Sequence, residues 1–246
     1  MNEYIVNVND LSYKYPDGYL GIKNISFQIK AGEKLGIIGY NGAGKSTLLK
    51  CLVGLLTVKN ESVKVDGIVL NKDSVKSIRE KVGFIFQDSD NQLFMNNVYE
   101  DIAFGLRNRL ISNEEIRIRV EKIICELGLD EIKMKQVYKL SGGQKKAVAL
   151  AGVMVMNPSI ILMDEPTAAL DPKARRRIIN IIRNFRDTVI VASHDLDMIL
   201  DCCSRVIILK NGEIFAQGQK SEILGNKKLM EDCGLELPLS TIRSFR

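Results

Sequence analysis

The sequence predicts a mixed α/β fold with a parallel core sheet, an antiparallel β layer and an inserted helical subdomain. Three observations predict this fold. A glycine-rich stretch, residues 39–47, lies between a short apolar run and a helical pattern. The run from Ser159 to Met163 is apolar after its first residue, as in strands that are covered on both faces. Between these two stretches, residues 88–158 have a mainly helical pattern.

Antiparallel strands are expected at the start of the chain. Residues 4–15 alternate loosely and end in the turn Pro16-Asp17-Gly18. Residues 21–30 place Ile25, Phe27 and Ile29 in strict alternation, and residues 62–67 suit a further short strand and turn. Antiparallel strands in front of a glycine-rich loop favour a small β layer that leans on an α/β core.

The glycine-rich stretch fits the phosphate-binding pattern G-x-x-x-x-G-K-[S/T] with Gly39, Tyr40, Asn41, Gly42, Ala43, Gly44, Lys45, Ser46 and Thr47. Glycines let consecutive N–H groups turn toward a β-phosphate, and the following helix adds its partial positive charge. Lys45 would reach the β- and γ-phosphates, and the Ser46 hydroxyl would ligate Mg²⁺. The loop alone does not choose a reaction, because kinases, GTPases and many ATPases share it.

The rest of the chain continues the core after the helical segment. A buried strand, residues 82–86, ends at Gln87 and is followed by a polar loop. Ser112 to Glu115 form a capping box, and Gly128 ends the helix that it starts. Further core strands are expected at residues 159–163 and 188–193, and a hairpin turns at Asn211-Gly212.

The predicted organisation is a single domain over residues 1–246. It has a core of residues 1–87 and 159–225, a helical subdomain of residues 88–158 and a short C-terminal tail of residues 226–246.

Composition narrows the class of protein. The chain has 246 residues, of which 26% are charged, and its net charge is only +5, so we expect a well-solvated surface and no nucleic-acid partner. The longest apolar run, Ala147 to Met156, is too short to cross a bilayer, and no signal peptide opens the chain. Any work on a membrane would therefore go through a partner. The five cysteines lack a C-x-x-C pair, so we expect buried reduced thiols.

The choice of reaction comes from a second motif, Leu140-Ser141-Gly142-Gly143-Gln144. It is the LSGGQ signature of ATP-binding-cassette (ABC) ATPases, a family that the sequence resembles. Ser141 and two glycines at the start of a helix make a second anion-binding N-terminus. One chain cannot readily use both N-termini on one nucleotide. The resemblance implies that two subunits pair head to tail, with each ATP between one phosphate loop and the partner's signature.

The same resemblance implies a P-loop NTPase (RecA-like) core, bound ATP and Mg²⁺, and further site residues. Gln87 matches the Q-loop, which contacts Mg²⁺ and the attacking water. Asp164 matches the aspartate that holds Mg²⁺ through water, and Glu165 resembles the general base. His194, the single histidine, matches the switch residue at the γ-phosphate, and residues 168–171 resemble the D-loop at the dimer seam. Tyr15 resembles the aromatic that stacks on adenine, although Tyr13 lies on the same predicted strand face and is the alternative.

A finer match is to ATPases of energy-coupling-factor (ECF) transporters, including cobalt-type members. It rests on residues 86–94, 98–105 and 149–153. The resemblance implies an importer of a transition-metal ion (cobalt or nickel) or a vitamin, with the chain at the cytoplasmic face of the membrane. Its partners would be a second ABC ATPase subunit, identical or related, a transmembrane ECF-type subunit and a substrate-binding membrane subunit. Val58, Glu61 and Lys146-Ala147 depart from the common pattern, and little of the usual C-terminal extension follows.

The sequence leaves an alternative function open. A soluble ABC ATPase that serves iron–sulfur cluster assembly is the alternative function, because it is also a single short cassette. A GTPase is excluded, since the chain has no Asn-Lys-x-Asp motif.

Four carboxylates lie close in sequence to Gln87, and some of them are expected to line the groove that receives a helix of the transmembrane subunit: Asp88, Asp90, Glu100 and Asp101.

Overall fold

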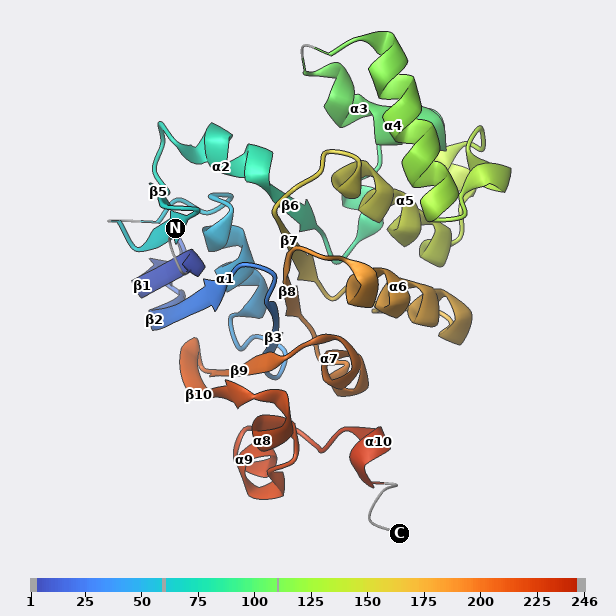
Figure 1. The fold of residues 1–246 in the computed structure, drawn as a ribbon. Coiled ribbons are helices and arrows are strands. Elements are labelled where there is room, and N and C mark those ends of the chain that lie inside the picture. Colours follow the sequence, from blue (N-terminus) through green and yellow to red (C-terminus); the bar gives the residue numbers. More distant parts are fainter. Residues whose placement is uncertain (1–3, 59–60, 110, 243–246) are drawn as a thin grey trace.

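The computed structural model describes residues 4–58, 61–109 and 111–242, and it contains two sheets (Figure 1). The first is antiparallel in the order β2-β1-β4-β5. Its strands are β1 (Tyr4–Lys14), β2 (Leu20–Lys30), β4 (Val63–Val65) and β5 (Ile68–Val69). Short turns join β1 to β2 and β4 to β5: the turn after β1 is closed by the Gly18 N–H, which donates to the Tyr15 carbonyl over 3.0 Å. The pairing of β1 with β4 instead joins segments that are far apart in the chain.

The core sheet has the order β10-β9-β3-β8-β7-β6. Its strands are β3 (Lys34–Ile38), β6 (Val82–Ile85), β7 (Ile160–Asp164), β8 (Thr188–Ala192), β9 (Arg205–Lys210) and β10 (Glu213–Gln219). Neighbouring strands are parallel except β9 and β10, which form the predicted hairpin. The turn of this hairpin needs positive φ at Asn211 (52°) and Gly212 (78°), residue types that tolerate it.

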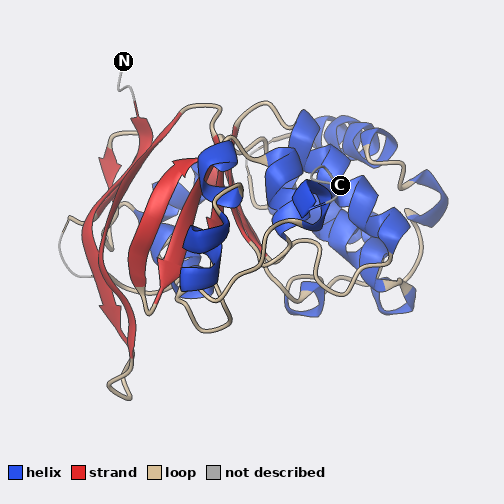
Figure 2. Ribbon diagram, turned by 90° about the horizontal axis from the view of Figure 1, so that it is seen from below, coloured by secondary structure: helices blue, strands red, loops and turns tan. Residues whose placement is uncertain are grey.

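The central strands β7 and β8 are buried along their whole length because both faces of the sheet are covered there, whereas the edge strand β10 has no fully buried residue (Figure 2). On one face, Leu162 and Ile190 pack with the antiparallel sheet and with Leu48 of α1 (Lys45–Leu52), which lies between the two sheets. On the other face, alternate residues such as Ile161 and Val191 pack against α6 (Pro172–Asn184) and α7 (Leu196–Cys202). The predicted α/β class is therefore confirmed.

The segment between β6 and β7 is helical, as predicted, and lies beside the core (Figure 1). It contains α3 (Val98–Arg107), α4 (Asn113–Glu126), α5 (Gly142–Met154) and the 3-10 turns η1 (Ser89–Asn91), η2 (Asp130–Ile132) and η3 (Val137–Lys139). The buried members of its own hydrophobic cluster run from Leu93 to Val155. Ser112 caps α4, as expected, but the Glu115 carboxylate pairs with Arg119 and does not complete the predicted capping box.

Several elements were not predicted from the sequence. One is α2 (Val75–Lys81), which has a single buried residue, Ile78, and so lacks a clear apolar periodicity. The C-terminal part contains α8 (Lys220–Leu224), α9 (Lys227–Asp232) and α10 (Leu239–Ile242). The start of α10 is held to α7, because Asp197 accepts hydrogen bonds from the N–H groups of Leu239 and Ser240.

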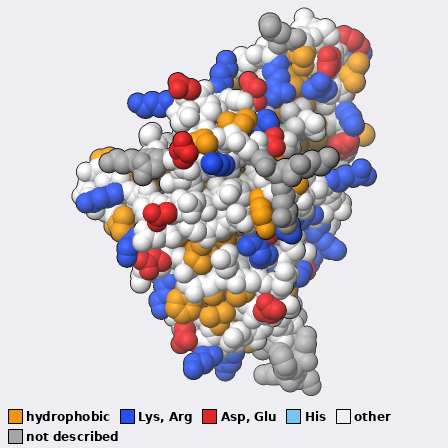
Figure 3. Space-filling model, turned by 60° about the vertical axis from the view of Figure 1, so that its left-hand side comes forward, with side chains coloured by type: hydrophobic (Ala, Val, Ile, Leu, Met, Phe, Trp, Pro, Cys, Tyr) orange, Lys and Arg blue, Asp and Glu red, His pale blue; other side chains and the backbone are white. Residues whose placement is uncertain are grey.

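The helices and the surface charges bear on how the chain could relate to a membrane. Within the described residues, no helix combines the length and the apolar character that crossing a bilayer requires. On the face shown in Figure 3, Lys and Arg side chains lie interspersed with Asp and Glu side chains.

The expectation of buried thiols holds for four cysteines and is wrong for Cys125, which is exposed on α4.

Candidate nucleotide-binding site

The phosphate loop connects β3 to α1, in the strand–loop–helix context that the motif requires. Gly39, Gly42 and Gly44 have φ of 155°, 85° and 104°, a region that favours glycine. A Cβ on Gly44 would also lie only 2.7 Å from the Gly21 carbonyl oxygen. A Cβ on Gly39 would lie 2.5 Å from the Leu209 carbonyl oxygen. All three positions therefore require glycine: Gly42 for its backbone angle alone, and Gly39 and Gly44 for both angle and space.

The hairpin turn between β9 and β10 supports the back of the loop. The Tyr40 hydroxyl contacts the Asn211 side chain and accepts the Asn211 N–H over 3.0 Å. The Gly212 N–H donates to the Ala43 carbonyl over 3.1 Å. Gly39, Tyr40 and Ala43 are thus structural members of the loop and do not line its cavity.

Lys45 is buried inside the loop. Its Nζ donates to the Gly39 carbonyl over 2.8 Å and to the Tyr40 carbonyl over 3.3 Å, and it lies 3.8 Å from Oε1 of Glu165. Burial lowers the pKa of Lys45, although Glu165 and Asp164 act in the opposite direction. This places a desolvated ammonium where an anionic ligand of the loop would meet it.

A hydrogen bond between Ser46 and Asp164 connects the phosphate loop to the end of β7. The Ser46 hydroxyl donates to Oδ1 of Asp164 over 3.0 Å, at the carboxyl end of β7. Burial raises the pKa of Asp164, and the Ser46 hydrogen bond lowers it. A hydroxyl and a carboxylate are hard oxygen donors, and Mg²⁺ in phosphate sites takes one or two such protein ligands. The residues present therefore fit Mg²⁺.

Glu165 is buried and held by residues at the end of β8. Its Oε2 accepts from the Ser193 hydroxyl over 2.9 Å and lies 2.9 Å from Nδ1 of His194. The His194 N–H donates to Oε1 over 3.1 Å. Glu165 has a φ of 46°, which is uncommon for a residue with a side chain and turns the chain sharply after Asp164. This carboxylate has a fixed orientation.

A cavity of about 620 Å³ brings together many of the predicted site residues, namely Tyr15, Asn41, Gly42, Gly44, Lys45, Ser46, Thr47, Gln87, Glu165 and His194. Tyr15 lies just after β1, and its hydroxyl is 2.9 Å from that of Thr47. Tyr13 does not line this cavity and instead packs against the core. The geometry therefore favours Tyr15 over Tyr13 as the aromatic residue of the site.

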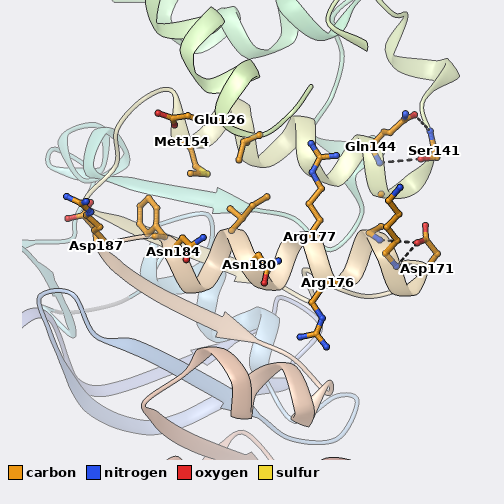
Figure 4. A pocket seen from close by; sticks show the side chains of 17 residues that line it. Glu126, Ser141, Gln144, Met154, Asp171, Arg176, Arg177, Asn180, Asn184 and Asp187 are labelled. Carbon is orange, nitrogen blue, oxygen red and sulfur yellow. Dashed lines mark hydrogen bonds between the residues drawn. The ribbon is translucent and has the colours of Figure 1, made fainter. Parts of the chain in front are cut away.

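The signature lies elsewhere, in a cavity of about 1030 Å³ between α5 and α6 (Figure 4). Ser141 and Gln144 form a complete capping box at the start of α5. A Cβ on Gly143 would lie 2.5 Å from that of Ala174, whereas one on Gly142 would meet nothing within 4 Å. Asp171 caps α6 at the same end of the cavity (Figure 4). No signature residue lines the phosphate-loop cavity.

The four carboxylates near Gln87 have partners within the chain. Asp88 caps η1 and Asp90 pairs with Lys145 over 2.5 Å. Glu100 pairs with Arg107 over 2.6 Å. Oδ2 of Asp101 accepts the N–H groups of Phe94 and Met95 over 2.9 and 2.8 Å. These contacts give all four carboxylates a structural role.

Four contributors to the site were missed from the sequence. Asp17 lines the cavity, and its Oδ1 accepts the Tyr19 N–H over 2.9 Å. Tyr19 lines the cavity and is 58% exposed, and its position after a turn gave no periodic signal. Gly21 must lack a side chain, since a Cβ there would lie 2.8 Å from the Tyr15 ring. Ser193 is buried beside Glu165, and its place immediately before His194 at a strand end was the available signal.

Comparisons with known proteins agree with this geometry. A protein-family model described as "ABC transporter" matches residues 22–168. The energy-coupling factor transporter ATP-binding protein EcfA of Carboxydothermus hydrogenoformans is 42% identical over 237 residues, which are 95% of this chain and 87% of that protein.

Two solved structures are also similar. The structure of cbiO1 from Clostridium perfringens, described as part of the ABC transporter complex cbiONQ, has a TM-score of 0.84 and 36% identity, covering 100% of both chains. The ATP-binding cassette MJ0796, in a dimeric post-hydrolysis state bound to ADP and Pi, has a TM-score of 0.80 and 31% identity, covering 87% of this chain and 98% of that one. The chain therefore belongs to the ABC transporter family of ATPases, among the ATP-binding proteins of the energy-coupling-factor type.

Proposed function

We propose that this chain is the ATPase subunit of an ECF-type importer, in which ATP hydrolysis by two paired cassettes drives a transmembrane partner. One observation carries the proposal: the phosphate loop and the signature lie in separate cavities, and each is built for an anion. A single chain therefore holds two half-sites, and a second ATPase subunit, identical or related, would complete both.

In each composite site, ATP would lie in the loop cavity with its adenine on Tyr15. Lys45 would bind the β- and γ-phosphates, and Mg²⁺ would be held by Ser46, with Asp164 and Gln87 at its water ligands. The 3.0 Å contact between Ser46 and Asp164 supports this assignment. Mg²⁺ would neutralise the phosphate charge that develops during transfer.

Glu165 is proposed as the general base. Its carboxylate is oriented by Ser193 and His194, so it can accept a proton from a water that attacks the γ-phosphate. His194 is 62% exposed on its side chain and so is open to the γ-phosphate as well as to Glu165. Gln87, which lines the same cavity, would position the attacking water.

The partner's signature would close the site over the phosphates. Gly142 supports this role, since the space around it is open to a ligand approaching the backbone. The D-loop, residues 168–171, has Ala169 at a φ of 58° and ends at Asp171, which caps α6 and lines the signature cavity.

A membrane subunit would dock beside the Q-loop, at the cytoplasmic face of the membrane. The proposed contact is the exposed aromatic pair Phe94 and Phe104, 64% and 39% exposed, with ring centroids 4.7 Å apart. Exposed aromatics that stack edge to face are typical anchors of interfaces.

The proposed division of the chain is a core of residues 1–87 and 159–225, a helical subdomain of residues 88–158 and a tail. It is supported by the separate hydrophobic cluster of the subdomain.

The transported substrate would be a cobalt or nickel ion or a vitamin, bound by a separate membrane protein. The test is to purify the chain from membranes of its own cell, identify the copurifying proteins and measure ATP-dependent uptake of these substrates by the reconstituted complex. We expect a transmembrane subunit, a substrate-binding membrane subunit and uptake of one substrate class. Copurification with iron–sulfur assembly proteins in place of membrane proteins would support the soluble alternative.

A further inference from the structure

A buried lysine on the signature helix holds the Q-loop. Lys146, in the second turn of α5, is 3% exposed. Its Nζ donates to the carbonyls of Phe86 and Gln87 over 2.9 and 2.8 Å. A buried cation is costly unless its donors are satisfied, and within the described residues these carbonyls are its hydrogen-bond acceptors. Such an arrangement strongly specifies the position of the backbone it binds.

The two hydrogen bonds define where the chain leaves β6. In an extended strand, successive carbonyls point in opposite directions, so one ammonium cannot bind both of them. The strand ends at Ile85, and the next two carbonyls converge on Lys146. The Phe86 N–H is also held, since it donates to Oε1 of Gln92 over 3.2 Å. Lys146 therefore fixes the turn from which the Gln87 side chain enters the nucleotide cavity.

Other contacts attach the same loop to α5. Lys145 pairs with Asp90 over 2.5 Å, and Nε2 of Gln92 donates to the Ala149 carbonyl over 3.5 Å. The Q-loop segment, residues 86–92, is thus bound to the signature helix at its beginning, middle and end. Ser141 caps this helix five residues before Lys146 and would face the partner's nucleotide.

We propose that Lys146 is a positioning residue for ATP hydrolysis, which holds Gln87 in its own nucleotide site and makes the Q-loop segment move with the helix that presents Ser141 to the partner's site. This inference rests on the proposed role of Gln87. Lys146 itself does not line the loop cavity and would not contact ATP there.

The test is a double-mutant cycle on the full chain assembled with its partners. Lys146→Met keeps the apolar stem and removes the donors. It is made alone and together with Gln87→Ala, with Lys122→Met, an exposed lysine on α4, as the matched control. We expect Lys146→Met to lower kcat about tenfold with little change in KM for MgATP, since the bond is to backbone and not to nucleotide. In the Gln87→Ala background the same change should lower kcat by less than about twofold.

Each outcome decides a separate point. If Gln87→Ala alone leaves kcat unchanged, the proposed role of Gln87 fails and the inference fails with it. If Gln87→Ala slows turnover but Lys146→Met does not, or lowers kcat equally in both backgrounds, the inference is wrong and the proposed function stands. Thermal unfolding shows which variants are folded. Should Lys146→Met be unfolded, the cycle is run with Lys146→Gln, whose shorter side chain is uncharged: a loss of kcat that disappears in the Gln87→Ala background supports the inference, and an equal loss in both backgrounds overturns it.

Discussion

Glu165 and His194 contact each other through both side chain and backbone. Nδ1 of His194 lies 2.9 Å from Oε2 of Glu165, and the His194 N–H donates to Oε1 over 3.1 Å. The same residue that orients the carboxylate is exposed toward the cavity. A movement of His194 on contact with the γ-phosphate would therefore also move the Glu165 carboxylate, because the two side chains are in direct contact.

Glu165→Gln should bind ATP yet hydrolyse it at least about a hundredfold more slowly, because the amide keeps the size and shape of the side chain but cannot accept the proton. ATP should then stabilise the dimer. Size-exclusion chromatography with and without ATP and a hydrolysis assay measure both effects, with the related ATPase supplied if the pair is mixed. Glu213→Gln, at an exposed carboxylate on β10, is the control. A mutant that stays monomeric in saturating ATP and turns over at the wild-type rate would contradict the assignment.

Tyr15→Ala should weaken ATP binding by about 1 kcal/mol or somewhat more, the size of one stacking contact between a base and an aromatic side chain. Tyr13→Ala should leave binding nearly intact and lower the thermal stability, because Tyr13 packs against the core and lies outside the cavity. Nucleotide titration and thermal unfolding of both variants separate the two roles. Equal losses of affinity would show that the stacking residue is wrongly chosen.

Phe94→Ser should weaken assembly with the membrane subunit and leave ATP binding unchanged, since the Phe94 ring is exposed and does not line the phosphate-loop cavity. A central aromatic anchor of an interface contributes about 2 kcal/mol or more. Pull-down of the complete transporter tests this. Phe215→Ser, at a 44% exposed aromatic on β10, is the matched control. Normal assembly of the Phe94 variant would remove this ring from the interface.

Asp101→Ala should lower the free energy of unfolding by about 1–3 kcal/mol, because it leaves the N–H groups of Phe94 and Met95 without their charged acceptor. Chemical denaturation measures the change. Asp201→Ala, at an exposed carboxylate paired with Arg176, should cost less than about 1 kcal/mol. Unchanged stability of the Asp101 variant, together with lost assembly, would restore the hypothesis that this carboxylate faces the membrane subunit.

Alkylation of the native protein near pH 8 should modify Cys125 first. Cys125 is exposed, whereas burial raises the pKa of Cys51 to about 12 and that of Cys202 to about 11, so these thiols are inaccessible and protonated. Mass spectrometry after timed iodoacetamide treatment gives the order of reaction. In denaturant all the cysteines should react at similar rates. Early modification of Cys51 in the native protein would show that the core around α1 opens.

The sequence determined the chemistry of the site and the class of fold. A phosphate loop constrains its own backbone through local glycine conformations, so its structure follows from adjacent residues. Continuous apolar runs such as Ile160 to Met163 require cover on both faces, which specifies a parallel sheet between layers. The serine cap of α5 likewise depends on residues three apart. These are local properties.

Tertiary structure decided which residues meet across long stretches of chain. It distinguished the roles of Tyr15 and Tyr13: β1 ends at Lys14, and the Tyr15 hydroxyl that follows contacts Thr47. It also brought Lys146 to the carbonyls of Phe86 and Gln87, which lie about sixty positions earlier in the chain. Neither contact has a periodic or compositional signal. Their energies come from packing of distant segments and the satisfaction of buried polar groups, which exist only in the folded chain.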